Sequence, residues 1–277
     1  MIAAVSALVA GHKPPSPTGN KAAAQPGNQG LASAAAVRTQ AVTWIAAQVG
    51  RDVSVACDPV ACSGLAAHGF PTSNLTVIQP TAPDPYGSVL VVATAAIRNQ
   101  FGSKLDTVYA PQVIASFGAG PTRIDIRVIA PLGPAAFREA LSADLAARKS
   151  SGAQLLHNSR IIVSAAARHQ LAAGLVDERL LTTLAFLAGQ HPVDVVGFGG
   201  VAPGASPGVP TRIVYLAESD AAAHQSGTAF LQAIESALRS QNPPYVPLSV
   251  GTVQLAGAQP VLQVEFAAPS PLGLLQS

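Results

Sequence analysis

The sequence predicts an α/β fold (or the related α+β class) made of two layered subdomains that follow a disordered N-terminal linker. Three observations support this prediction. Short segments rich in valine and isoleucine alternate along the chain with longer segments of helical periodicity. Residues 11–33 are rich in Pro, Gly, Asn and Gln and poor in large apolar side chains, which is typical of a linker. A chain of 277 residues is long enough for one large domain or two ordinary ones.

The first 33 residues are predicted to contain the remnant of an anchor and the spacer that follows it. Residues 1–10 are apolar but too few to cross a bilayer, which takes about 20 helical residues. No basic residue precedes them, unlike in a complete signal peptide. We interpret them as the trailing part of a signal or membrane anchor that starts upstream; a frayed apolar tail is the alternative. Residues 11–33 would then tether an exported domain to the membrane.

Residues 34–151 form the first predicted subdomain. Its second paired strand alternates apolar residues with Arg123, Asp125 and Arg127, which predicts one solvated face of charged side chains. The turn Gly118-Ala119-Gly120-Pro121 separates this strand from its partner. The predicted helices cover residues 34–49, 88–101 and 135–149, and the predicted strands cover residues 53–55, 75–78, 108–117 and 123–129.

Cys57 and Cys62 are the only cysteines of the chain. In an oxidising compartment they can close a small loop, with Asp58 as N-cap and Pro59 in the first turn of a short helix. Structural zinc takes four ligands, and the two cysteines supply only two of them. A redox pair more often has two intervening residues. A structural disulfide is therefore the leading interpretation, ahead of free thiols and of metal or redox chemistry.

Residues 152–277 form the second predicted subdomain, and its best-defined part is the stretch 160–198. Gly174 can adopt positive φ and end a first helix, and Asp177 is placed to cap the next one. Pro192 cannot continue that second helix. No internal repeat relates the two subdomains. The predicted helices cover residues 165–174, 176–190 and 226–240, and the predicted strands cover residues 160–164, 193–196, 212–216, 246–255 and 261–266.

The composition excludes some classes of partner. Charged residues make up 11% of the chain, about half the share usual in soluble domains. The net charge of +2 comes from scattered residues, without the basic stripe that follows a phosphate backbone. We therefore expect no nucleic-acid partner, and membrane contact only through the N-terminal anchor. The usage of Ala, Gly, Pro and Arg with little Lys suggests a high-GC, actinobacterial source.

The motifs that could carry chemistry are incomplete. Gly204-Ala205-Ser206-Pro207-Gly208 has the letters of a nucleophile elbow, but Pro207 has no N–H to donate to an oxyanion. Gly197-x-Gly199 is followed by no predicted helix that could hold a pyrophosphate. The six histidines show no clear metal-ligand spacing; Asp220 and His224 could share a helix face, yet a capping Asp and an exposed His explain them as well. We predict no catalytic motif, metal site or cofactor.

Residues 171–196 resemble segments of known families. Gly174-x-Val176-Asp177-x-Arg179-Leu180-Leu181, an apolar helix, and His191-Pro192-Val193-x-Val195 resemble a segment of actinobacterial exported proteins. The stretch also resembles the helix–strand entry to zinc D-alanyl-D-alanine carboxypeptidase and hedgehog-like domains. Those families hold zinc with histidines and an aspartate in the next strands, whereas residues 199–218 contain no histidine here. The resemblance implies a related domain without the zinc site and without its hydrolysis.

A broader resemblance covers roughly residues 37–270. With its Cys57-Asp-Pro-x-x-Cys62 element, the first half resembles uncharacterised membrane-anchored envelope proteins of actinobacteria. This resemblance names no activity. It implies an extracytoplasmic protein, membrane-anchored or secreted.

Three functional hypotheses follow. The leading one is a non-enzymatic, extracytoplasmic binding or scaffold protein of the cell envelope, tethered to the membrane, whose partner is an envelope component such as a peptidoglycan peptide, or a protein. The second is an envelope peptide hydrolase with several polar residues gathered in a cleft. The third is a small-solute-binding domain with its cleft between the halves, near residues 150–160. The candidate cleft residues are Asp177, Arg179, His191, Asp194 and Glu218.

Overall fold

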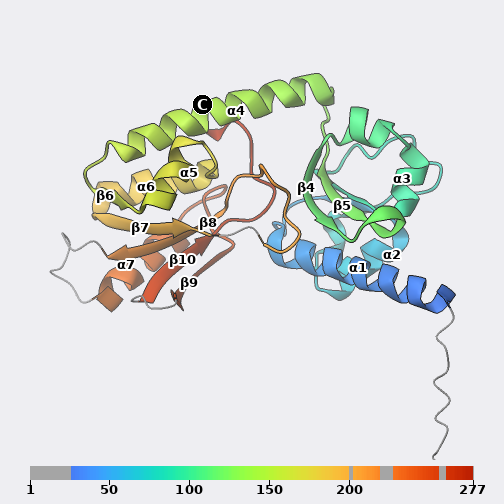
Figure 1. Cartoon of the computed structure of the whole chain (residues 1–277), viewed down its shortest axis with the longest axis horizontal. Helices are drawn as coiled ribbons and strands as arrows, with labels where there is room; N and C mark the ends of the chain where they lie inside the picture. Colours follow the sequence, from blue (N-terminus) through green and yellow to red (C-terminus); the bar gives the residue numbers. More distant parts are fainter. Residues whose placement is uncertain (1–25, 200–201, 219–226, 256–259, 277) are drawn as a thin grey trace, which may run out of the picture.

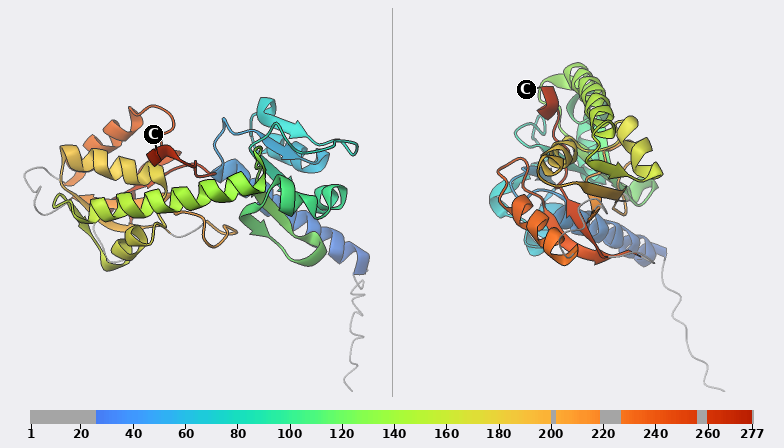
Figure 2. Two further views of the ribbon diagram at one scale, coloured as in Figure 1. Left: turned by 90° about the horizontal axis from the view of Figure 1, so that it is seen from above. Right: turned by 90° about the vertical axis from the view of Figure 1, so that its left-hand side faces the viewer.

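The computed structural model describes residues 26–199, 202–218, 227–255 and 260–276. In this part of the chain, helices pack on two five-stranded mixed sheets, which confirms the predicted α/β class. The sheets lie toward opposite ends of an elongated molecule, and helix α4 (Gly133–Leu156) runs along it from one to the other (Figures 1 and 2). None of the described helices is long and apolar enough to cross a membrane.

The first sheet has the strand order β2-β1-β3-β5-β4. Strand β1 is parallel to β2 and β3, whereas β5 is antiparallel to both β3 and β4. The pairing of β4 with β5 confirms the two strands predicted around the Gly118–Pro121 turn. The strands are β1 (Val55–Cys57), β2 (Leu75–Val77), β3 (Leu90–Ala93), β4 (Gln112–Phe117) and β5 (Ile124–Val128).

Helices cover both faces of the first sheet, which gives three layers. On one face α1 (Pro26–Gln48) and α2 (Pro59–Ala67) bury residues such as Ile45 and Leu65 against the strands. On the other face α3 (Ala95–Phe101) and the turn η2 (Leu105–Tyr109) pack a smaller core. Full burial of such a side chain contributes about 1.5–3 kcal/mol.

Three expectations for the first half need correction. The helix predicted over residues 88–101 contains strand β3, because a short run of buried apolar residues fits a fully covered strand as well as a helix. Helix α1 begins at Pro26, inside the predicted linker; residues 1–25 lie outside the described chain. Asp125 and Arg127 do not form a solvated face but are 4% and 6% exposed.

The second sheet has the strand order β6-β7-β8-β10-β9. Only β6 and β7 are parallel, and the other pairs are antiparallel. Alternate strand residues such as Val195, Leu216 and Val264 are buried in a single core with the helices. The strands are β6 (Ile161–Val163), β7 (Val193–Phe198), β8 (Ile213–Glu218), β9 (Ser249–Gln254) and β10 (Pro260–Glu265), and the helices are α5 (Ala165–Ala172), α6 (Glu178–Gln190) and α7 (Gly227–Arg239).

The two sheets end in the same arrangement of strands. In each, a strand is followed by a helix and then by two strands, the last of which lies between the other two. The first sheet shows this in β3-α3-β4-β5 and the second in β8-α7-β9-β10. The halves therefore share a local topology that their sequences do not reveal.

Helix α4 continues through the boundary predicted at residues 151 and 152 and joins the halves without a break. Gly152 sits in the middle of this helix because a Cβ there would collide with the carbonyl oxygen of Leu171 in α5. The predicted caps of the next helices are confirmed. Gly174 has a φ of +68°, and Asp177 accepts a hydrogen bond from the backbone N–H of Arg179 at 2.9 Å.

Candidate functional site

The two halves meet at a contact, here called the seam, that is built from three segments. These are the C-terminal end of α1, the loop between β7 and β8, and the segment after β10, residues 266–276, here called the strap. Ala268 of the strap forms a parallel bridge with Val49. Its N–H donates to the Gln48 carbonyl at 2.6 Å, and its own carbonyl accepts from Gly50 at 3.1 Å. The strap thereby reaches from the second sheet into the core of the first.

The loop between β7 and β8 covers part of the free edge of β4. The Ser116 N–H donates to the Gly204 carbonyl at 2.7 Å, and the Ser206 N–H donates to the Ile114 carbonyl at 2.9 Å. These two bonds add a short antiparallel partner to the first sheet. The Gly204–Gly208 segment, whose letters match a nucleophile elbow, is therefore an edge cover.

Asp177 and Arg179, two of the predicted cleft residues, lie at the seam and bind each other. The Asp177 carboxylate accepts from the Arg179 Nε at 2.9 Å and Nη2 at 2.8 Å. Nη2 also donates to the Ala267 carbonyl at 2.7 Å, and the guanidinium lies 5.0 Å from the centre of the Phe266 ring. Both charges are buried and paired. Through the bond from Arg179 to Ala267, the Asp177–Arg179 pair attaches the strap to the start of α6.

Arg212, at the start of β8, joins the same three segments. Its guanidinium donates to the Phe266 carbonyl and, at 2.9 Å, to the Gln48 side-chain oxygen. Burial lowers the pKa of Arg212, an effect opposed by the charges of Asp177 and Glu265.

A groove of ≈ 580 Å³, here called the Trp44 groove, opens on the seam. Its volume lies within the range of small-molecule sites, about 300–1,000 Å³. None of the described residues that line it is charged. The helix α1 contributes Thr39, Gln40, Thr43, Trp44, Ala47 and Gln48. The opposite wall consists of Ser116, Phe117, Gly118 and residues 202–204.

Trp44 is the central side chain of the groove. It is 6% exposed and packs at a tilt against Phe117, with ring centroids 6.2 Å apart. Its Nε1 is buried and has no hydrogen-bond acceptor among the described residues. A buried donor without a partner costs about 1–3 kcal/mol.

Other donors of the groove are also unused within the described chain. Gln48 accepts from Arg212 through its oxygen, which leaves its amide nitrogen as a donor. The side chains of Gln40 and Thr43 make no hydrogen bond to any described residue. The groove thus offers amide, hydroxyl and indole groups beside apolar surface, and no formal charge.

A second polar feature lies at the far end of the seam, where α4 meets α6. Asp144 accepts from Arg148 Nε at 2.7 Å, and Glu178 accepts from the Leu274 N–H of the strap at 2.6 Å. The remaining oxygens, Asp144 Oδ1 and Glu178 Oε1, have no donor among the described residues. The Asp144 carboxyl group is close enough to Glu178 to raise its pKa through a hydrogen bond and through its charge. Such a bond requires that one of them carries a proton.

The pKa of Glu178 is raised to about 7. Burial is the largest cause, followed by the hydrogen bond to Asp144 and the charge of Asp144. The N–H groups of Leu274 and Leu275 act in the opposite direction. Glu178 therefore keeps its proton in mildly acidic conditions and loses it near neutral pH.

Two small cavities follow the seam between the groove and this pair. One, of ≈ 30 Å³, is lined by Trp44, Gln48, Arg212 and Ser270 among others. The other, of ≈ 40 Å³, is lined by Asp144 and again by Ser270. Each is large enough for a water molecule, which needs about 10–15 Å³. The strap residue Ser270 lines both cavities.

The other three predicted cleft residues lie elsewhere. Glu218 ends β8 and pairs with Val193, and Asp194 pairs with Ala217. Asp177, by contrast, donates its N–H to Thr211, just before β8 begins. A strand of six residues is about 20 Å long, so Asp177 and Glu218 flank opposite ends of β8.

His191 lies near the Glu218 end of β8, at the C-terminus of α6. Its ring packs edge-on against Phe230, with centroids 6.2 Å apart. The structure therefore brings together Asp177 and Arg179 but does not gather all five predicted residues in one cleft.

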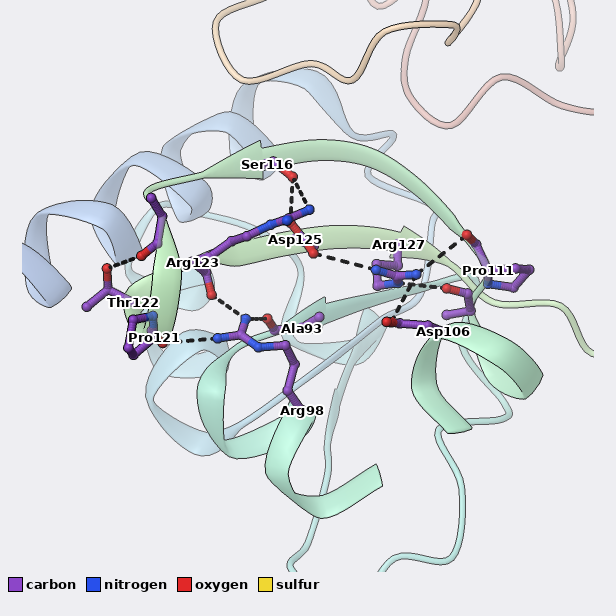
Figure 3. Close-up of polar contacts among 12 residues, drawn as sticks. Ala93, Arg98, Asp106, Pro111, Ser116, Pro121, Thr122, Arg123, Asp125 and Arg127 are labelled. Carbon is purple, nitrogen blue, oxygen red and sulfur yellow. Dashed lines mark hydrogen bonds and ion pairs between the residues drawn. The ribbon is translucent and has the colours of Figure 1, made fainter. Parts of the chain in front are cut away.

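The charged residues of β5 form a closed network on the face of the first sheet that carries α3. Figure 3 shows Asp125 between Arg123 and Arg127, and it accepts from Arg123 Nε at 2.7 Å and from Arg127 Nη1 at 3.5 Å. Arg127 Nη2 also approaches Asp106 at 3.1 Å. Arg98 donates to the carbonyls of Pro121 and Arg123 (Figure 3). These charges are used within the protein, so we assign them a structural role.

Cys57 and Cys62 form a disulfide, as predicted from their spacing. Asp58 caps α2 by accepting from the Ala61 N–H at 2.8 Å, and it also accepts from the Thr94 hydroxyl at 2.6 Å. Across the described ranges, no three His, Cys, Asp or Glu side chains are placed to hold a metal ion. The possible pair Asp220 and His224 lies outside these ranges.

Comparisons with known proteins identify no relative: no family model, no curated protein and no solved structure matches this chain.

The residues that define the groove and the carboxyl pair were not predicted from the sequence. Trp44 is the only tryptophan of the chain and lies within the predicted helix 34–49 as one of its largest apolar residues. Asp144 and Arg148 have the i, i+4 spacing of an ordinary surface ion pair, although they are buried. Glu178 directly follows a capping aspartate, where an acidic residue is expected for the helix dipole. Each local pattern has an ordinary structural explanation, so no local signal distinguishes these residues.

Proposed function

We propose that this protein is a non-enzymatic binding module of the cell envelope, and that the Trp44 groove holds its ligand. The observation that supports the proposal is an uncharged groove of ≈ 580 Å³ beside a buried indole N–H that has no acceptor among the described residues. The groove lies between the halves, where the small-solute hypothesis also expected a site, but beside α1 rather than near residues 150–160.

The lining of the groove favours an uncharged ligand. Carboxylates and phosphates are bound through charge-assisted hydrogen bonds from Arg or Lys, and neither residue lines the groove. Hydroxyl and acetamido groups instead match the hydroxyl of Thr43, the amide of Gln40 and the indole N–H of Trp44. We therefore propose the neutral glycan portion of an envelope polymer as the ligand.

The proposed location rests on the disulfide and on the family resemblance. A disulfide is typical of proteins that work in an oxidising compartment. The resemblance to membrane-anchored actinobacterial envelope proteins adds a tether through the residues that precede α1. In this proposal the tether supplies the only membrane contact, and no nucleic acid, metal or cofactor takes part.

The hydrolase hypothesis receives less support. It required the predicted polar residues to converge, whereas Asp177 and Glu218 flank opposite ends of β8. Ser206 uses its backbone to pair with β4, and Pro207 offers no oxyanion donor. The region of the zinc site in the resembling carboxypeptidases forms the seam loop and β8 here.

Trp44 makes the proposal directly testable because it is the only fluorescent indole of the chain. The full chain would be titrated with chitotetraose, a neutral acetamido glycan, and with peptidoglycan fragments with and without stem peptides. We expect saturable changes in Trp44 emission with the glycan-only ligands. Saturation only with monosaccharides or other free small molecules would favour the small-solute hypothesis. No change with any uncharged ligand would contradict the assignment of the groove.

Variants sharpen this test. Gln40→Ala and Thr43→Val each remove one neutral hydrogen-bonding group, worth about 0.5–1.5 kcal/mol, so we expect Kd to rise about 2- to 10-fold. Gln154→Ala is the matched control, because Gln154 lines a different uncharged groove between α4 and α6. The control should bind like the wild type.

A further inference from the structure

We propose that Asp144 and Glu178 form a pH-operated latch that holds the strap across the seam. In the closed state the two carboxyl groups share one proton. When both groups ionise, the strap is released at its C-terminal end and the seam beside the Trp44 groove loosens. This inference does not depend on the identity of the groove ligand.

The strap is held at both of its ends. At its start, Ala267 accepts from Arg179 and Ala268 pairs with Val49 of the first half. At its end, the Leu274 N–H donates to Glu178 Oε2 at 2.6 Å, and Leu275 packs against the core of the second half. The described C-terminus lies beside α4 (Figure 1). Glu178 is the side chain that fixes the distal end of the strap to α6.

The pair needs its shared proton to remain closed. Asp144 is 1% exposed and Glu178 is 1% exposed, and the facing oxygens Oδ1 and Oε1 have no other donor in the described chain. With one proton, each facing oxygen takes part in a hydrogen bond. Without it, two buried negative charges face each other, which is strongly unfavourable.

The charged neighbours do not neutralise a second negative charge. Arg148 already donates to Asp144 and to the Gly174 carbonyl. Asp177 and Arg179, which flank Glu178 in sequence, pair with each other. The helix α5, packed on α4, carries Arg168 and His169 on its exposed side. The strap itself has no charged side chain over residues 266–276.

The direction of the pH dependence of the latch follows from the raised pKa of Glu178. The pKa of Glu178 is raised to about 7, so the pair is closed in mildly acidic conditions and loses its proton as the pH rises. Between the ordinary pKa of 4.5 and about 7, opening releases one proton, so the opening equilibrium changes by up to about tenfold for each pH unit and levels off above that range. The latch therefore opens toward alkaline pH.

Opening of the latch would affect the Trp44 groove because the strap lies beside it. Pro269 and Ser270 line the small cavity that Trp44 and Gln48 also line. Displacement of the strap would change the surroundings of the indole. Trp44 emission is therefore a second reporter of the latch, in addition to the strap amides.

The test is hydrogen exchange of the strap amides in the full chain between pH 5.5 and 8.5, corrected for the intrinsic exchange rate. We expect protection over residues 270–276 to fall about tenfold between pH 6 and pH 8. Glu178→Gln should remain protected at both pH values, because its amide nitrogen can donate to Asp144 while its oxygen accepts from Leu274. Glu235→Gln, which removes a partly exposed carboxylate paired with Arg239, is the control and should behave like the wild type.

Two results would overturn the latch. One is strap protection in the wild type that does not change with pH, and the other is an unchanged pH dependence in Glu178→Gln. Asp144→Asn provides an independent variant, which should also abolish the pH dependence while keeping a donor for Glu178. If neither variant folds, the wild-type infrared carbonyl band of a protonated carboxyl group decides the question. That band should disappear with a midpoint near pH 7, and its absence at pH 6 would refute the latch.

Discussion

Arg212 and Gln48 are 164 residues apart in the chain, and the guanidinium of the first donates to the side-chain oxygen of the second at 2.9 Å. Arg212 directly precedes the strand β8, and Gln48 ends the helix α1, so this bond connects the two halves directly. It also fixes the orientation of Gln48, which lines the Trp44 groove. The same contact therefore serves the stability of the seam and the shape of the groove.

Replacement of Gln48 by alanine should destabilise the protein. It removes the acceptor of a buried guanidinium, which costs about 1–3 kcal/mol. Urea unfolding gives the change in the free energy of unfolding. Gln40→Ala is the control, since Gln40 lies on the same helix and its side chain bonds to no described residue; equal stability of both variants would contradict the role given to Gln48.

Gly204→Ala should disrupt the loop that covers β4. Gly204 has a φ of +92°, and a Cβ would collide with the Phe117 ring. Gly208→Ala is matched to it, because Gly208 has a φ of +84° but nothing within 4 Å of the added Cβ. Both changes carry a backbone cost of about 1 kcal/mol, and only Gly204→Ala adds a steric clash. Thermal unfolding should rank Gly204→Ala below Gly208→Ala, and the reverse order would show that the clash is relieved.

Reduction of the Cys57–Cys62 disulfide should lower stability modestly. The bond closes a short loop, with five residues of sequence separation, so the entropic contribution is about 2 kcal/mol. Unfolding with and without reductant measures this difference.

Thiol labelling of protein exported with its native upstream region tests the compartment: both cysteines should react only after reduction. Free reaction in a cell extract would remove the support for export.

Stability should decrease as the pH rises toward neutrality because of Glu178. Its pKa is raised from 4.5 to about 7 in the folded protein, so the folded state binds the proton more tightly than the unfolded state does. The contribution of this group is fully present below about pH 4.5 and is lost as the pH rises through about 7. Urea midpoints measured across this window should show the slope in the wild type. In Glu178→Gln the slope should be smaller, and an unchanged slope would assign it to another group.

Much of the architecture could be predicted because it depends on local patterns. Asp177 at the start of α6 and the Cys57-Asp58-Pro59 element at the start of α2 are signals contained within a few residues. The strand β3 was missed because its run of valines is buried on both sides and shows no alternation. Asp125 and Arg127 alternate as surface residues do, but the packing of η2 and the β4 edge against them buries their charges.

The seam could not be predicted, because its contacts join residues that are far apart in the chain. Nothing near Trp44 indicates that its indole N–H has no acceptor, since that depends on where residues 202–204 and the strap lie. The proton shared by Asp144 and Glu178 likewise depends on the packing of α4 on α6. Periodicity predicts which face of a helix is buried, but not which other helix it meets.

The cover on β4 also bears on how this protein misfolds. An unpaired strand edge is a template on which another chain can add a strand and begin to aggregate. In the intact molecule, the N–H groups of Ser116 and Ser206 are bonded within one chain, so this part of the edge is closed. If the second half unfolds while the first remains folded, residues 114–116 lose that cover. The first half is then exposed to intermolecular strand addition, and the protection of one sheet against aggregation depends on the folding of the other.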